Sequence, residues 1–149
     1  MNLKEKINTD LKAAMKAKDK VKLQTIRSIR ALILEHEKSG KSEEMTPEGE
    51  ISLLTSAAKK RKESIEQYRN AGREDLAANE EAELKVIQEY LPKQLSEDEI
   101  FDKIKEIAAE VGASTKQDFP KLMPASMKAL KGMADGKVVK ELVTRFLGN

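Results

Sequence analysis

The sequence has no cysteine or tryptophan, and two tyrosines and three phenylalanines are its only aromatic residues. The absence of cysteine excludes disulfides, thiolate nucleophiles and cysteine-based zinc sites. Scarce aromatics and the absence of alternating β-branched runs argue against a β-sheet. No apolar run approaches the roughly 18 residues of a membrane span, and charged residues interleave with apolar ones from the N-terminus onward. These absences predict an all-α protein of the cytoplasm that contacts no membrane.

Apolar residues recur at helical spacing along the first part of the chain. The first stripe repeats every four residues and consists of Leu3, Ile7, Leu11 and Met15. Three more apolar stripes follow, over residues 23–34, 51–68 and 76–91. Gly72 separates the third stripe from the fourth, and Pro92 ends the fourth. The pattern predicts a four-helix N-terminal domain over residues 1–93, built as two hairpins.

Residues 94–149 have the pattern of a separate three-helix bundle. Ser96 and Glu99 match a capping box that opens a helix. Apolar stripes follow over residues 100–111, 119–130 and 139–146. Pro120 suits a first helical turn, whereas Pro124 removes an amide and crowds the preceding turn, so we expect a break or kink near Phe119 to Pro124. The predicted fold class is therefore all-α in two helical parts.

Two charged residues interrupt the apolar stripes on either side of Gly72. If the two helices form an antiparallel hairpin, positions whose numbers add up to about 144 face each other, so Arg61 lies opposite Glu83. A cation on an apolar stripe must bury its stem and pair its head group. We therefore predict a structural ion pair between Arg61 and Glu83, with a role for Arg61 as a phosphate ligand as the alternative.

Charge is unevenly distributed although the formal net charge is only +2. Residues 1–73 carry 17 Lys/Arg against 11 Asp/Glu, residues 74–112 carry 4 against 12, and residues 113–149 carry 7 against 3. Basic zones of this kind can bind a polyanion, or they can be ordinary solvated helix faces. The candidate RNA-binding residues are Lys121, Lys128, Lys131, Lys137, Lys140 and Arg145, the glycines Gly132 and Gly136 for close backbone approach, and Lys59 and Lys60 in a second patch.

No residue pattern indicates catalysis. The chain contains no Gly-rich phosphate loop followed by Lys and Ser/Thr. Ser28, Ser56 and Ser64 lie within predicted helices without an evident base or oxyanion hole. The single histidine, His36, is expected to stabilise a helix C-terminus. We therefore predict no catalytic residue, no metal site and no cofactor.

Three segments resemble a known family. Residues 68–76 (Tyr-Arg-Asn-Ala-Gly-Arg-Glu-Asp-Leu) and 89–96 (Glu-Tyr-Leu-Pro-Lys-Gln-Leu-Ser) are similar to motifs of the YqeY-like family. Residues 131–137 (Lys-Gly-Met-Ala-Asp-Gly-Lys) also resemble the tail domain of the B subunit of glutamine-dependent aspartyl/glutamyl-tRNA amidotransferase. The resemblance implies an all-α protein related to a tail that helps to hold tRNA. This sequence departs from the family pattern at Pro120 and Pro124, where small residues are usual.

Three functions are therefore open. The first is a non-catalytic accessory module that binds tRNA or another folded RNA, because lysines without aromatic platforms suit shape recognition rather than base stacking. The second is a helical protein-interaction module without an RNA role, whose partner belongs to the translation or aminoacylation machinery. The third rests on the resemblance alone, and is a component of a carbon–nitrogen ligase with glutamine as amido-N-donor.

Overall fold

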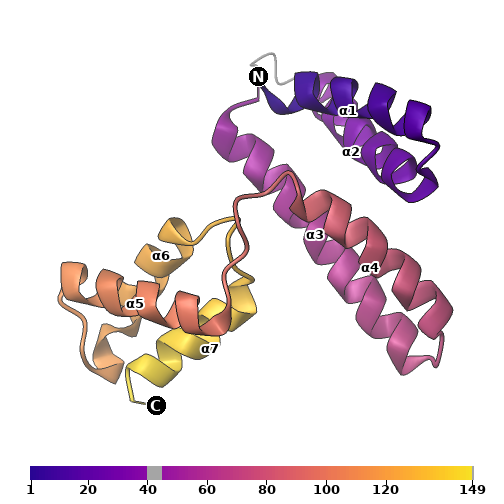
Figure 1. Cartoon of the computed structure of the whole chain (residues 1–149). Coiled ribbons are helices and arrows are strands. Elements are labelled where there is room, and N and C mark those ends of the chain that lie inside the picture. Colours follow the sequence, from indigo (N-terminus) through magenta and orange to yellow (C-terminus); the bar gives the residue numbers. More distant parts are fainter. Residues whose placement is uncertain (40–44, 149) are drawn as a thin grey trace. The chain divides into compact units, whose positions relative to one another are not determined.

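The computed structural model describes residues 1–39 and 45–148, and every regular element in these two ranges is helical (Figure 1). The prediction of an all-α chain is confirmed for this part. The elements are, in chain order, α1 (Leu3–Ala17), α2 (Lys20–Lys38), α3 (Pro47–Asn70), α4 (Glu74–Gln88), α5 (Glu97–Val111), the short 3₁₀ helix η1 (Lys116–Asp118), α6 (Phe119–Ala129) and α7 (Gly136–Phe146). Among the described residues, no helix is both long enough and apolar enough to cross a bilayer.

The chain divides into a first unit, Met1–Leu91, and a second unit, Pro92–Asn149, each with its own core of buried apolar side chains. The first unit consists of the hairpins α1–α2 and α3–α4 (Figure 1). Gly72 forms the turn between α3 and α4 at φ 74°, a conformation that glycine adopts without a Cβ penalty. Helix α4 packs against both α3 and α2. The largest fully buried apolar side chains of this unit are Ile7, Ile26, Ile29, Leu54 and Ile87.

The inward face of α1 differs from the predicted stripe at its last position. Leu3 and Ile7 are buried as predicted, but Met15 is 54% exposed and Ala14 is buried in its place. An α-helix turns by about 100° per residue, so a strict four-residue repeat drifts by about 40° at each step. After three steps Met15 has rotated out of the core, whereas Ala14 stays within about 20° of Leu3.

In the second unit α5, α6 and α7 pack pairwise around one core. Its fully buried side chains include Ile104, Leu122, Leu142 and Val143. The predicted capping box at Ser96 and Glu99 is present: Ser96 accepts from the Glu99 amide, and the Glu99 side chain accepts from the Ser96 amide. Asp135 caps α7 in the same way, because its carboxylate accepts from the Lys137 amide at 2.9 Å.

The first residues of the second unit, which precede α5, are hydrogen-bonded to the rest of that unit. The Gln94 side-chain amide donates to the Gly132 carbonyl at 2.6 Å and to the Pro92 carbonyl at 2.9 Å. The Leu95 amide donates to the Met133 carbonyl at 2.9 Å. The two bonds to Gly132 and Met133 hold this segment against the turn that joins α6 to α7.

The predicted break near Pro124 does not occur. Helix α6 runs without interruption from Phe119 to Ala129, with Pro120 in its first turn and Pro124 inside it. Both prolines are exposed, whereas Leu122 and Ser126 are buried on the opposite face. The carbonyl that loses its amide partner can therefore bond to water, while the packing of the buried face keeps the turn in place.

Candidate functional site

The six basic residues predicted for the second unit are all exposed. Together they are termed the C-terminal basic set, which consists of Lys121 and Lys128 on α6, Lys131 in the following turn, and Lys137, Lys140 and Arg145 on α7. Lys121 and Lys128 are seven residues apart and therefore share one face of α6. Lys137 and Lys140 are three residues apart and share one face of α7.

None of the ion pairs between described residues includes a member of the C-terminal basic set. Lys121 differs from the others, because its ammonium lies 3.9 Å from where a Cβ on Gly112 would be, at the C-terminal end of α5. Bonds from the amides of Ser114 and Thr115 lower the pKa of the nearby Asp118 carboxyl, and the charge of Lys121 contributes to that shift. Lys121 thus already has a structural use, since a cation stabilises a helix C-terminus.

The two glycines predicted to approach a ribose–phosphate backbone differ in their contacts within the second unit. Gly132 is buried at φ 80°, and its carbonyl accepts from the Gln94 side chain. At Gly136 an added Cβ would lie 3.2 Å from Met127 Cε, the flexible end of a side chain. The backbone of Gly132 therefore has a structural use in the fold, whereas the contact with Met127 does not by itself require glycine at position 136.

Arg61 and Glu83 meet as the hairpin register predicts. Arg61 Nη1 lies 3.4 Å from Glu83 Oε2 and 3.4 Å from Glu80 Oε2, and Arg61 Nη2 lies 3.5 Å from the Ser28 hydroxyl. The Glu83 side chain is only 6% exposed. Burial raises the pKa of the Glu83 carboxyl; the Arg61 guanidinium opposes this rise and the Glu80 carboxylate adds to it. With two carboxylates beside one guanidinium, Arg61 has no excess positive charge to offer a phosphate.

Lys59 and Lys60 are exposed on α3, and only Lys60 lines a groove between α2 and α3. The groove has a volume of about 360 Å³. Its lining residues are Ser28, Ala31 and Leu32 from α2, and Leu53, Ser56, Ala57, Lys60 and Arg61 from α3. Small residues on α2 and on α3 were a signal for this groove in the sequence, but α2 and α3 do not form a hairpin, so hairpin register does not bring these residues together.

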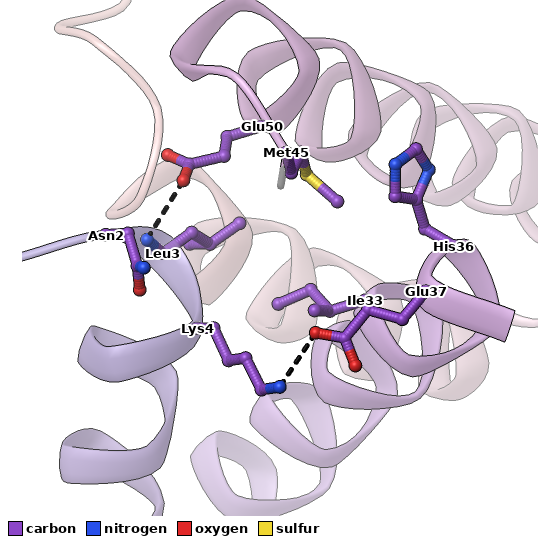
Figure 2. A pocket seen from close by; sticks show the side chains of 8 residues that line it. All are labelled: Asn2, Leu3, Lys4, Ile33, His36, Glu37, Met45 and Glu50. Carbon is purple, nitrogen blue, oxygen red and sulfur yellow. Dashed lines mark hydrogen bonds and ion pairs between the residues drawn. The ribbon is translucent and has the colours of Figure 1, made fainter. Parts of the chain in front are cut away.

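A second pocket, of about 150 Å³, lies where α1 begins and α2 ends (Figure 2). Lys4 Nζ pairs with Glu37 at 2.7 Å across its edge, and the Leu3 amide donates to Glu50 at 3.2 Å. His36 and Met45 also line this pocket (Figure 2). Four of the polar groups around this pocket thus already form two bonded pairs. No cluster of three or more metal-ligating side chains occurs in residues 1–39 or 45–148.

Ser28 and Ser56 show no nucleophile geometry. The Ser28 hydroxyl donates to the Thr25 carbonyl at 2.7 Å, a bond common for serine within a helix. Ser56 is exposed in the groove, next to Ala57 and one helical turn before Lys60. The hydroxyls of Ser28 and Ser56 form no hydrogen bond with a carboxylate or imidazole of the described residues.

The chain matches the family model described as Yqey-like protein over residues 4–147. Among curated proteins, "Altered inheritance of mitochondria protein 41, mitochondrial" from Pyrenophora tritici-repentis is 35% identical over 147 residues, covering 96% of this chain and 80% of the relative. The protein of the same name from Lachancea thermotolerans is 30% identical over 150 residues, covering 93% and 80%. That from Vanderwaltozyma polyspora is 46% identical over 88 residues, covering 57% and 46%.

The prediction of a cytoplasmic location is wrong, because these relatives are named as mitochondrial proteins. Amino-acid composition does not determine the compartment of this protein. A chain without cysteine has no thiol to oxidise, so its composition is compatible with oxidising and reducing compartments alike.

Proposed function

This chain belongs to the YqeY-like protein family, and from that premise we propose that it is a non-catalytic accessory module that binds tRNA or another folded RNA through its second unit. One observation carries the proposal: residues 113–149 carry 7 Lys/Arg against 3 Asp/Glu, and the C-terminal basic set is exposed. Lysines in this state can neutralise phosphates and release the counterions bound to them.

We also propose that the two units are separate domains with different functions. A four-helix domain, α1 to α4, and a three-helix domain, α5 to α7, would fold independently, and the second would contact RNA. The members of the C-terminal basic set other than Lys121 lie exposed on α6 and α7 and in the turn between them, and they form no ion pair with a described residue. We expect Lys128, Lys131, Lys137 and Lys140 to contribute most, because Lys121 already lies against the end of α5.

Recognition would follow RNA shape rather than base identity. Phe101 and Phe146 stack edge to face at 6.1 Å within the second unit, so they are not free platforms for unpaired bases. Proteins that read single strands rely on such platforms, whereas folded RNA can be bound through phosphates and 2′-hydroxyls. A role in carbon–nitrogen ligation would then be indirect, with this chain holding the RNA while another subunit supplies the nucleophile.

The test is binding of fluorescein-labelled total tRNA to the full-length protein, followed by anisotropy over a range of salt concentrations. Changing Lys131, Lys137 and Lys140 to Glu should lower affinity at least about tenfold at low salt. It should also reduce the slope of log K against log salt by about 2 to 3, since each lost phosphate contact contributes about 0.7 to 0.9.

The matched control changes three exposed lysines of the first unit, Lys12, Lys16 and Lys20, to Glu, which alters the net charge by the same amount. This variant should keep most of the affinity and the salt slope. Equal losses in the two variants would mean that only net charge matters, and unchanged binding in the first would reject the proposed surface. Turnover of glutamine and ATP by the purified chain would establish the enzymatic alternative.

A further inference from the structure

The groove between α2 and α3 exists because small side chains face each other there. Helix α2 contributes Ser28 and Ala31, and α3 contributes Ser56 and Ala57. Each pair leaves room that longer side chains would fill, so the helices enclose about 360 Å³ of space that side chains of this unit do not occupy.

The groove is apolar and open to solvent. Ala31 is exposed, and Leu32, Leu53 and Ala57 are half-buried. By contrast, apolar residues on the core faces of the same helices, such as Ile29 and Leu54, are buried. Covering the first four of these residues would remove further apolar surface from water. The volume lies within the range of about 300 to 1,000 Å³ that is typical of small-molecule pockets, but such pockets enclose most of the ligand, whereas this groove is open to solvent. It therefore suits a few aliphatic side chains of a larger partner.

The polar groups that line the groove are hydroxyls and cations, and no carboxylate lines it. Arg61 is engaged by Glu80 and Glu83, and the Ser28 hydroxyl donates to the Thr25 carbonyl. The Lys60 ammonium is exposed and forms no ion pair with a described carboxylate. Charge complementarity therefore requires an anionic or acceptor group at the Lys60 end of the groove.

We infer that this groove binds an acidic amphipathic helix of a partner protein. The helix inserts leucine-type side chains between α2 and α3, and a carboxylate one turn further along pairs with Lys60. A groove between two helices accepts a third helix by this pattern of anchors at i, i+3, i+4 and i+7, and the small residues of the walls allow close approach. RNA is the poorer match, because phosphates gain nothing from Leu32, Leu53 and Ala57.

The probe is a fluorescein-labelled, helix-forming peptide of about 15 residues, with leucines at i, i+3, i+4 and i+7 and glutamate one turn later. A second peptide has lysine in place of that glutamate. Full-length protein should bind the glutamate peptide about three- to tenfold more tightly than the lysine peptide, since an attractive charge pair replaces a repulsive one.

Lys60→Glu should reverse this preference, so that the lysine peptide binds more tightly. Lys59→Glu is the matched control, because Lys59 is the exposed neighbour on α3 that does not line the groove. It should leave the preference of the wild-type protein in place. If both variants shift the preference equally, the effect is long-range charge and the inference fails.

Ala57→Leu fills the groove and should abolish binding of both peptides. The helix content and melting temperature of this variant should be at least those of wild type, which separates loss of the site from loss of the fold. Its affinity for tRNA should be unchanged, so this result is independent of the RNA proposal. Absence of peptide binding to wild type up to about 1 mM, or retention of binding by Ala57→Leu, would overturn the inference.

Discussion

The half-buried cluster of Arg61, Glu80 and Glu83 makes the sharpest prediction about stability. Arg61→Met keeps the aliphatic stem but removes the guanidinium that lies 3.4 Å from both carboxylates. Removing one partner of a buried pair costs about 3 to 5 kcal/mol, because the other charge remains buried and uncompensated. We expect about 3 kcal/mol, the low end, since the Arg61 side chain is 26% exposed.

The loss should depend on pH in a defined direction. Burial has already raised the pKa of the Glu83 carboxyl, and removing Arg61 raises it further because the opposing charge is gone. The folded state then holds a proton that the unfolded state has lost, so the free energy of unfolding falls as pH rises from about 4.5 through the raised pKa. Arg61→Met should therefore cost most at neutral pH and distinctly less near pH 4.5.

The aromatic residues provide a selective assay. Both tyrosines, Tyr68 and Tyr90, lie in the first unit, and all three phenylalanines lie in the second. Tyrosine fluorescence during thermal unfolding thus follows the unit that contains the mutation. A loss of 3 kcal/mol in a unit of this size should lower its melting temperature by about 12 °C or more.

Arg69→Met is the matched control, because Arg69 also lies on α3 and pairs with two carboxylates, Glu74 and Glu81. Its side chain is 49% exposed, so its loss should cost at most about 1 kcal/mol. Equal losses in the two variants, or a loss in Arg61→Met that is the same at neutral and acid pH, would refute the reasoning about burial.

Three further predictions concern single contacts and the division into units. Tyr90→Phe should cost about 1 to 2 kcal/mol in circular-dichroism melts, because Asp10 loses a hydrogen bond of 2.5 Å. Burial and the hydrogen bond to Asp10 also raise the pKa of Tyr90, so absorbance titration should show Tyr90 ionising well above the ordinary range of tyrosine. The folded state then keeps a proton that the unfolded state loses, so the free energy of unfolding should fall as pH rises past about 10. Gly132→Ala should destabilise the second unit by about 1 to 2 kcal/mol because of its positive φ, whereas Gly136→Ala should be neutral or slightly stabilising, since only the flexible end of Met127 has to move. Residues 92–149 expressed alone should melt cooperatively, and a non-cooperative melt would argue against a separate domain.

The sequence predicted those structural features that depend on residues close together along the chain. The helical class, the capping box at Ser96 and the turn at Gly72 follow from short-range spacing, and all three are present. The approach of Arg61 to Glu83 followed from hairpin geometry, because α3 and α4 are consecutive and their register is set by the turn between them.

Features that depend on side-chain placement or on packing between the two hairpins were missed. The hairpin register placed Arg61 opposite Glu83 but did not show that Glu80, three residues earlier on α4, shares the same guanidinium. The groove between α2 and α3 depends on how the two hairpins pack. The bond from the Gln94 side chain to the Gly132 carbonyl was not predicted, because the two residues lie 38 positions apart in the sequence. At Pro124 the local rule for helix breaking was outweighed by the buried face of α6.

The open space beside Ala31 and Ala57 has a consequence for laboratory evolution. Larger aliphatic residues at these positions would fill that space and raise thermal resistance, and stabilising substitutions of this kind are readily found where function is not under selection. A library selected only for survival at high temperature should therefore become enriched in leucine or methionine there. A library that must also retain its partner should keep alanine, and comparing the two outcomes would show which residues are maintained for association rather than for folding.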